Sequence, residues 1–103
     1  MIFQHTHHLI GHGKTQTTRR IPRRESFYRV GRTYAVQPGR GKAAIGRIRI
    51  VNIGIVRNPL EVGIDYANAE GFETVAAWRE TWRKLHGKQA GEPALVIEFE
   101  VAE

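Results

Sequence analysis

The sequence predicts one small α+β domain, in which short strands surround two consecutive helices. Alternating apolar and polar residues mark strands in both halves of the chain, and a helical repeat of apolar residues precedes the last of these strands. The 103 residues suit a single domain over residues 1–103, since a chain of this size buries one core and has no room for a second. Because strands predominate, we expect their sheet to curl into a barrel with the helices beside it.

The first half of the chain contains three predicted extended segments. Residues 1–3 can open a short strand, and the β-branched residues 15–21 predict an extended segment. Tyr34 and Val36 indicate a further strand, which ends at the turn signal of residues 37–39.

The clearest strand is predicted over residues 43–51, where apolar residues alternate. In an extended chain, successive side chains point to opposite faces. Arg47 and Arg49 therefore share one face. Ile48 and Ile50 share the other, which we expect to be buried.

Two helices are predicted after this strand. The first covers residues 65–70 and ends at Gly71. Thr74 can cap the second, which Gly87 closes. Its apolar residues recur at helical spacing: Val75, Trp78, Trp82 and Leu85. This spacing favours the two tryptophans as core residues over the alternative that they stack on bases. Residues 94–101 alternate as the last strand.

Charge is distributed unevenly along the chain. Residues 1–49 contain eleven Lys and Arg against one acidic residue, residues 50–103 contain five against nine, and the whole chain carries +6. A basic half predicts a surface that attracts anions. Phosphate groups are common cellular anions, so a nucleotide or nucleic acid is the favoured partner. The alternative is that the positive charge serves solubility alone.

Composition excludes several classes of protein. With no cysteine, the chain has no disulfide framework, no thiol nucleophile and no cysteine-based zinc or iron–sulfur site. No apolar run approaches the roughly 20 residues that span a bilayer, and the N-terminal residues lack the pattern of a signal peptide. We therefore expect a soluble, cytoplasmic protein with no membrane partner and no obligate protein partner.

Four histidines lie close together near the N-terminus: His5, His7, His8 and His12. On a helix, His8 and His12 would share a face at a spacing that can bind zinc, but no nearby Asp, Glu or Cys completes a ligand set. We therefore expect no functional metal site, and nothing in the sequence indicates a cofactor.

A basic segment over residues 13–20 carries the first candidate chemistry. Lys14 lies near Arg19 and Arg20, whose charge would lower its pKa and favour a neutral amine that acts as a base toward a hydroxyl. The alternative is a solvated basic strand. An extended segment has two faces: Lys14, Gln16 and Thr18 on one, and Thr15, Thr17 and Arg19 on the other.

Glu70 is the second candidate. It lies at the C-terminus of the first predicted helix, where the helix dipole disfavours negative charge. A carboxylate at this position needs a compensating partner or has a functional role. The alternatives are a surface glutamate and a salt bridge to one of the arginines.

These segments together resemble the ASCH domain. The resemblance rests on Gly-Lys-Thr-Gln-Thr-x-Arg near the N-terminus, Asp-x-Ala-x-x-Glu-Gly-Phe at residues 65–72, the tryptophan-bearing helix and the terminal Val-Ile-Glu-Phe strand. It covers residues 13–101 and implies a PUA-like ASCH pseudo-β-barrel with flanking helices beside a cleft, and RNA binding. Many relatives lack a counterpart of Thr18. An alignment without a gap assigns the motif arginine to Arg19, and one with a gap assigns it to Arg20.

The resemblance also implies an activity. Some small ASCH proteins are amidohydrolases that remove the acyl group from the exocyclic amine of N4-acetylcytidine. By position, the implied catalytic residues are Lys14, Thr17 and Glu70, as base, nucleophile and pyrimidine-binding acid. Other relatives are described as ribonucleases, so the alternative is an RNA-binding module. Four arginines are candidates for binding the nucleoside or RNA: Arg19, Arg20, Arg47 and Arg49.

Overall fold

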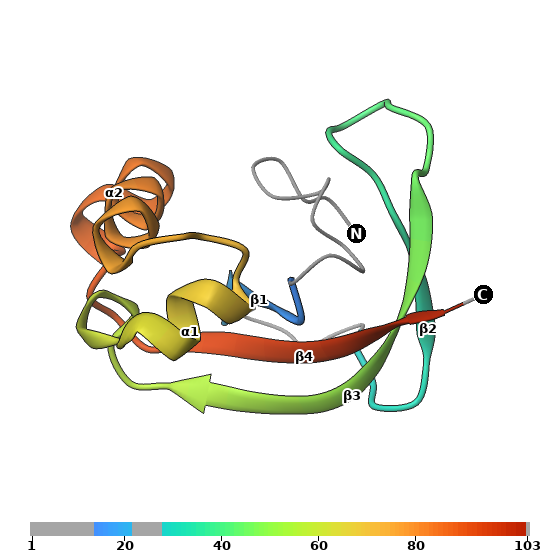
Figure 1. Cartoon of the computed structure of the whole chain (residues 1–103), viewed down its shortest axis with the longest axis horizontal. Helices are drawn as coiled ribbons and strands as arrows, with labels where there is room; N and C mark the ends of the chain where they lie inside the picture. The colour runs from blue at the N-terminus through green and yellow to red at the C-terminus, as the bar shows by residue number, and fades with distance from the viewer. Residues whose placement is uncertain (1–13, 22–27, 103) are drawn as a thin grey trace.

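The computed structural model describes residues 14–21 and 28–102, which form an antiparallel four-stranded sheet and two α-helices (Figure 1). In chain order the elements are β1 (Gln16–Arg20), β2 (Thr33–Val36), β3 (Gly46–Val56), η2 (Pro59–Glu61), α1 (Ile64–Ala69), α2 (Val75–His86), η3 (Gly87–Gln89) and β4 (Ala94–Ala102), where η denotes a short 3₁₀ helix. The predicted α+β class is confirmed. The sheet formed by the described strands is open rather than closed into a barrel, and its strand order is β1-β4-β3-β2. The predicted strand over residues 1–3 and the histidine cluster lie outside the described residues.

β3 differs from the predicted strand in its bounds. It begins at Gly46 and ends at Val56, whereas alternation predicted residues 43–51. A bulge between Ile50 and Asn52 interrupts its pairing with β4. Because a bulge inserts an extra residue, the side chains before and after it do not follow one alternating pattern. The second half of the strand was therefore missed.

The first half of β3 has the predicted faces. Arg47 and Arg49 are exposed, while Ile48 and Ile50 are fully buried. The buried side joins two apolar clusters of the sheet. One contains Val36, Ile48 and Phe99, and the other contains Ile50, Leu95 and Ile97.

The two helices lie together near the Ala94 end of β4 (Figure 1). Their core contains the buried residues Ala67, Trp78, Trp82, Ala90 and Ala94. The rings of Trp78 and Trp82 stack with centroids 5.3 Å apart. Their indole nitrogens donate to the carbonyls of Pro59 and Ala90, at 2.8 and 2.9 Å. The prediction that both tryptophans are core residues is confirmed.

The helix ends agree with their sequence signals. Thr74 Oγ1 accepts a hydrogen bond from Ala77 N at 3.0 Å, as a helix N-cap does. Gly71 follows α1 with a φ of 97°, a conformation that side-chain-bearing residues rarely adopt. Among the described residues, no helix is both long and apolar enough to cross a membrane.

Candidate active site

The candidate site lies where the start of β1 meets the end of α1. Thr15 N donates to Ala69 O at 2.8 Å, and Lys14 Nζ donates to Glu70 O at 2.8 Å. The last carbonyls of a helix lack partners within the helix and carry the negative end of its dipole. This position therefore favours the charged form of Lys14, a residue that is 5% exposed.

The Glu70 side chain is almost fully buried, with 2% of its surface exposed. Three hydrogen bonds from β1 reach its carboxylate. Gln16 Nε2 donates to Oε2 at 2.8 Å, Thr18 Oγ1 donates to Oε2 at 2.9 Å, and Thr18 N donates to Oε1 at 3.1 Å. These donors compensate for burial and for the unfavourable helix dipole. The alternative of a surface glutamate is therefore wrong.

A tyrosine extends this network. Tyr66 OH is hydrogen-bonded to Thr18 Oγ1. The tyrosine ring packs against Trp78, with ring centroids 5.6 Å apart, so the helical core fixes its position. Burial and the nearby Glu70 carboxylate raise the pKa of Tyr66, which keeps its hydroxyl protonated.

Opposing effects act on the pKa of Glu70. Burial raises the pKa of Glu70 because it removes water from the carboxylate. The positive charge of Lys14 lowers this pKa, as do the hydrogen bonds from Gln16 and Thr18. Burial is the largest of these effects, so the net direction is upward.

The pKa of Lys14 shifts in the opposite direction. Burial lowers the pKa of Lys14 from 10.5 to about 8, the Glu70 carboxylate opposes the change, and the charge of Arg19 adds to it. The sequence predicts this lowering from crowding by Arg19 and Arg20. The structure instead makes burial the main cause. With this pKa, roughly a tenth of the lysine is neutral at pH 7.

Thr17 lies apart from this network, although it is adjacent in sequence to residues that form it. It is 6% exposed and pairs in register with Ile97, a member of the sheet core. Successive side chains alternate along a strand. Gln16 and Thr18 therefore project toward Glu70, and Thr17 projects from the other face of β1.

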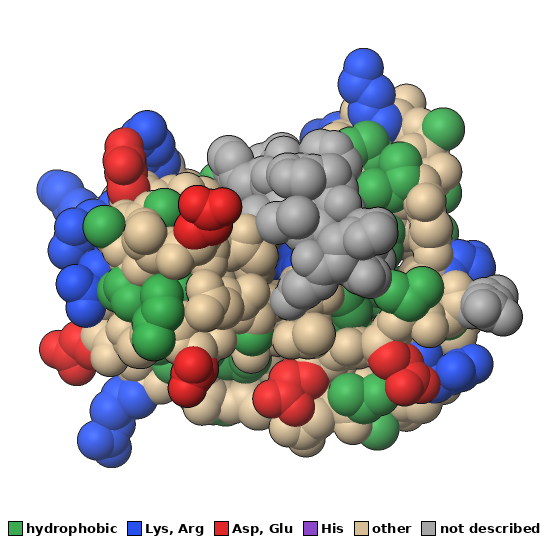
Figure 2. All heavy atoms as spheres, in the orientation of Figure 1, with side chains coloured by type: hydrophobic (Ala, Val, Ile, Leu, Met, Phe, Trp, Pro, Cys, Tyr) green, Lys and Arg blue, Asp and Glu red, His purple; other side chains and the backbone are tan. Residues whose placement is uncertain are grey.

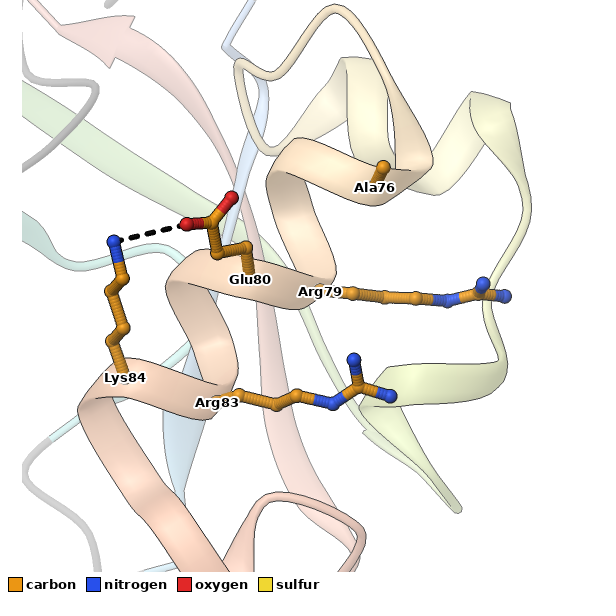
Figure 3. A pocket seen from close by; sticks show the side chains of 5 residues that line it. All are labelled: Ala76, Arg79, Glu80, Arg83 and Lys84. Atoms are coloured by element: carbon orange, nitrogen blue, oxygen red, sulfur yellow. Dashed lines mark ion pairs between the residues drawn. The ribbon is translucent and has the colours of Figure 1, made fainter.

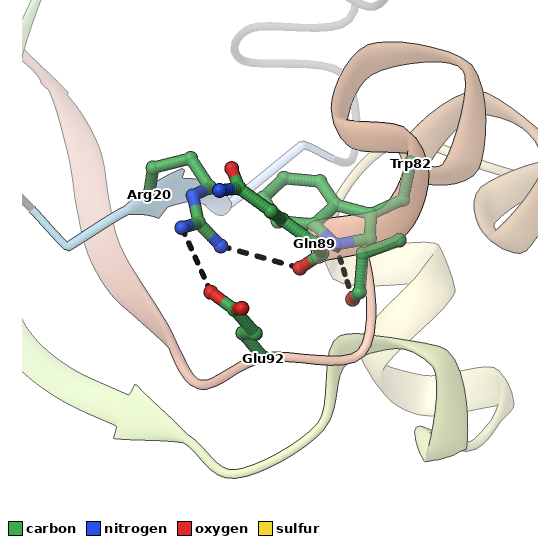
Figure 4. Close-up of polar contacts among 5 residues, drawn as sticks. Arg20, Trp82, Gln89 and Glu92 are labelled. Atoms are coloured by element: carbon green, nitrogen blue, oxygen red, sulfur yellow. Dashed lines mark hydrogen bonds and ion pairs between the residues drawn. The ribbon is translucent and has the colours of Figure 1, made fainter.

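The two neighbouring arginines have different surroundings. Burial lowers the pKa of Arg19, while Tyr28 and Glu70 oppose this change. The charge of Arg19 in turn lowers the pKa of Lys14, so Arg19 lies within electrostatic range of the site. Arg20 instead pairs with Glu92 at 3.0 Å and donates to Gln89 O at 3.2 Å (Figure 4). The structure thus directs Arg20 toward the segment that follows α2.

The remaining two candidate arginines lie on the exposed face of β3. Arg47 Nη2 donates to Thr33 Oγ1 at 3.1 Å, and Arg49 pairs with Glu100 at 3.5 Å. Neither contacts Glu70 in the described part of the chain. They form an exposed basic position on the sheet rather than part of the buried network.

A hollow of about 430 Å³ lies along the exposed side of α2, lined by Ala76, Arg79, Glu80, Arg83 and Lys84 (Figure 3). Glu80 and Lys84 form an ion pair at 3.0 Å on one side of it, and the arginines extend to the other side. None of the predicted site residues lines this hollow. Within residues 14–21 and 28–102, no three His, Asp or Glu side chains gather as a metal site requires.

Comparison with solved structures establishes the fold. The chain superposes on an ASCH domain from Lactobacillus crispatus with a TM-score of 0.77 and 21% identity, over 93% of this chain and 69% of that one. This chain has the ASCH-domain fold. A DUF984 protein from Enterococcus faecalis gives a TM-score of 0.73 and 20% identity, over 93% of this chain and 66% of that one. No protein-family model matches the chain, and no curated protein matches it.

Three residues of this ASCH-fold site were not assigned a role from the sequence: Gln16, Thr18 and Tyr66. Alternation placed Gln16 and Thr18 on the same face as Lys14, but nothing indicated what that face contacts. Tyr66 precedes Glu70 by four residues, a spacing that brings two helical side chains to one side. That spacing is the signal by which it could have been found.

Proposed function

We propose that this protein is an amidohydrolase that removes the acyl group from the exocyclic amine of an N4-acylated cytidine. The observation that supports this best is the buried pair of Lys14 and Glu70, a lysine with a pKa of about 8 beside a carboxyl group with a raised pKa. Opposite shifts of this kind suit two groups that exchange protons near neutral pH. The residues are also those to which the ASCH resemblance assigns the reaction.

In the first half of the proposed reaction, the side chain of Lys14, which precedes β1, turns from Glu70 O to the face of the strand that carries Thr17. There its neutral amine takes the proton of Thr17 Oγ1. The threonine oxygen then attacks the acyl carbonyl. Arg19, on the same face of β1 as Thr17, stabilises the oxyanion of the tetrahedral intermediate. The C–N bond breaks, protonated Glu70 gives its proton to the leaving amine, and cytidine departs.

The second half returns the protein to its starting state. The protonated Lys14 passes its proton to Glu70, which restores both groups. Lys14 then takes a proton from water, the hydroxide attacks the threonine ester, and the ester C–O bond breaks. Lys14 returns the proton to Thr17. One amide and one water thus yield one amine and one carboxylic acid.

The test is hydrolysis of N4-acetylcytidine, with cytidine measured by chromatography. Lys14→Met keeps an unbranched apolar stem of matching length but removes the amine, and kcat should fall by roughly 100-fold or more, as for a lost general base. Lys88→Met removes an exposed lysine and should leave kcat unchanged. Absence of cytidine from the unmodified protein would refute the proposal.

Variants of Thr17 and of the nearby Thr15 test which oxygen is the nucleophile. Thr17→Val removes the proposed attacking oxygen and should abolish turnover. Thr15→Val removes an exposed hydroxyl two residues earlier and should preserve it. Full activity of Thr17→Val would assign the attack to a different oxygen, while Lys14 and Glu70 would remain the candidates for proton transfer.

RNA binding is the second candidate function, and the charge distribution favours it. Residues 1–49 contain eleven Lys and Arg against one acidic residue. Figure 2 shows Lys and Arg side chains over α2 and over the loop between β2 and β3, while acidic side chains lie along the lower edge of the view and also over α2. For either function we propose a cytoplasmic location, a nucleoside or RNA as ligand, and no obligate protein partner.

Salt dependence separates the two functions. Binding that neutralises several phosphates weakens steeply as salt increases, whereas hydrolysis of an uncharged nucleoside does not. Fluorescence anisotropy with a labelled single-stranded RNA would measure this between about 50 and 200 mM salt. Tight, salt-sensitive binding that weakens in an Arg47→Ala, Arg49→Ala double variant, without any deacylation, would favour the RNA-binding module.

A further inference from the structure

A hydrogen-bond chain that the proposed reaction does not use ends at the Glu70 carboxylate. Tyr66 OH is hydrogen-bonded to Thr18 Oγ1, which in turn lies 2.9 Å from Glu70 Oε2. Tyr66 is on α1, Glu70 is the C-cap of that helix, and Thr18 is on β1. The series of hydrogen bonds therefore crosses from the helix to the strand and back. The contact with Trp78 holds the tyrosine ring in place.

The members of this chain differ from the other groups that bind the carboxylate. Gln16 Nε2 and Thr18 N can only donate, so they fit the ionised form of Glu70. The hydroxyls of Thr18 and Tyr66 can both donate and accept. When Glu70 is ionised, Tyr66 donates to Thr18 and Thr18 donates to Glu70. When Glu70 is protonated, each bond reverses, and the proton of Glu70 points to Thr18.

Reversal matters because the carboxyl group is buried. A buried polar group that loses its partner is costly, and a group that gains and loses a proton needs partners in both states. With the chain present, Thr18 Oγ1 contacts the carboxyl group in either state. In the described part of the chain, the other charged or titratable groups that act on Glu70 are Lys14, which precedes β1, Arg19 from β1, and Tyr66 from α1.

We propose that Thr18 and Tyr66 are positioning residues that allow Glu70 to release and take up its proton while it stays buried. The proposal deepens the amidohydrolase function and rests on Glu70 as the proton donor of that reaction. It assigns Thr18 a role distinct from that of the proposed nucleophile Thr17. Neither positioning residue needs to contact the substrate.

The first test does not require turnover. Titration of the Glu70 carboxyl carbon by ¹³C NMR, assigned with Glu70→Gln, reports its pKa in each variant. Thr18→Val removes a hydrogen bond from both forms of Glu70. Because the bond to the anion is charge-assisted and therefore the stronger of the two, this pKa should rise by about one, and Thr18→Ser should restore it. Thr15→Val is the matched control. A Glu70 pKa in Thr18→Val that equals the control value overturns the proposal.

The second test uses kinetics with N4-acetylcytidine. Tyr66→Phe keeps the ring that packs on Trp78 but removes the hydroxyl, so the fold is retained. We expect kcat to fall about tenfold with KM unchanged, the factor that corresponds to one hydrogen bond of ordinary strength. An unchanged kcat in Tyr66→Phe overturns the proposal. If the unmodified protein fails to hydrolyse the nucleoside, the amidohydrolase function is refuted. The NMR titration still tests the hydrogen bonds from Tyr66 through Thr18 to Glu70.

Discussion

Burial of Lys14 makes a prediction about stability as a function of pH. Its pKa is 10.5 in the unfolded chain and about 8 in the folded protein. Below pH 8 the lysine is charged in both states, and the folded protein carries the full cost of burying the ammonium. As pH rises from 8 to 10.5, the folded protein loses this proton before the unfolded chain does. Stability from this group therefore increases with pH across that interval.

The magnitude follows from the two pKa values. The difference between 10.5 and about 8 corresponds to about 3 kcal/mol, gained at roughly 1.4 kcal/mol per pH unit. Other groups titrate in the same range, including Tyr66, whose raised pKa acts in the opposite direction. A comparison with Lys14→Met cancels their contributions, because that variant retains them and lacks only the amine.

The assay is urea denaturation at several pH values between 7 and 10, with the free energy of unfolding measured for both proteins. Urea is preferred to guanidinium because added salt would screen the charges. The stability of the unmodified protein relative to Lys14→Met should rise by about 2.5 kcal/mol between pH 7 and 10. Lys88→Met, which changes an exposed lysine, serves as control. A relative stability that stays constant from pH 7 to 10 would refute the reasoning about the buried ammonium.

Three further predictions concern the fold, and each is measured by urea denaturation at pH 7. Trp82→Ala removes a side chain that is 2% exposed in the helical core and should cost about 3–5 kcal/mol, and a cost below about 1 kcal/mol would contradict its place there. Thr74→Ala removes the N-cap of α2 and should cost about 1 kcal/mol, whereas Thr74→Ser should cost little, and equal stabilities would argue against the cap. Arg20→Ala breaks a partly exposed ion pair with Glu92 and should change stability by less than about 1 kcal/mol, so a larger loss would mean that this pair is not screened by water.

Local periodicity predicted the helices well because their signals lie within a few residues of one another. The spacing of Trp78 and Trp82, the cap at Thr74 and the glycine after each helix all agree with the structure. The end of β3 could not be predicted in this way. Its bulge depends on pairing with β4, which is distant in sequence.

Only part of the candidate site could be predicted from the sequence, for the same reason. The dipole at the end of α1 indicated that Glu70 needed a partner, and the charge near Lys14 indicated a lowered pKa. That these two residues are partners depends on the docking of β1 against α1, which no local pattern reveals. The relation of Thr17 and Thr18 to Glu70 depends on the same docking, because alternation gives two faces but not what each one contacts.

The position of β1 in the sheet has a consequence for the order of assembly during synthesis. β1 leaves the ribosome before the other strands, but its only strand neighbour in the described sheet is β4, the last to be made. Its start also binds the end of α1 through Thr15 and Lys14. The segment that carries Lys14 therefore finds all its partners only after α1 and β4 have been synthesised. A nascent chain that stops before β4 would hold every proposed catalytic residue but not the strand that pairs with β1.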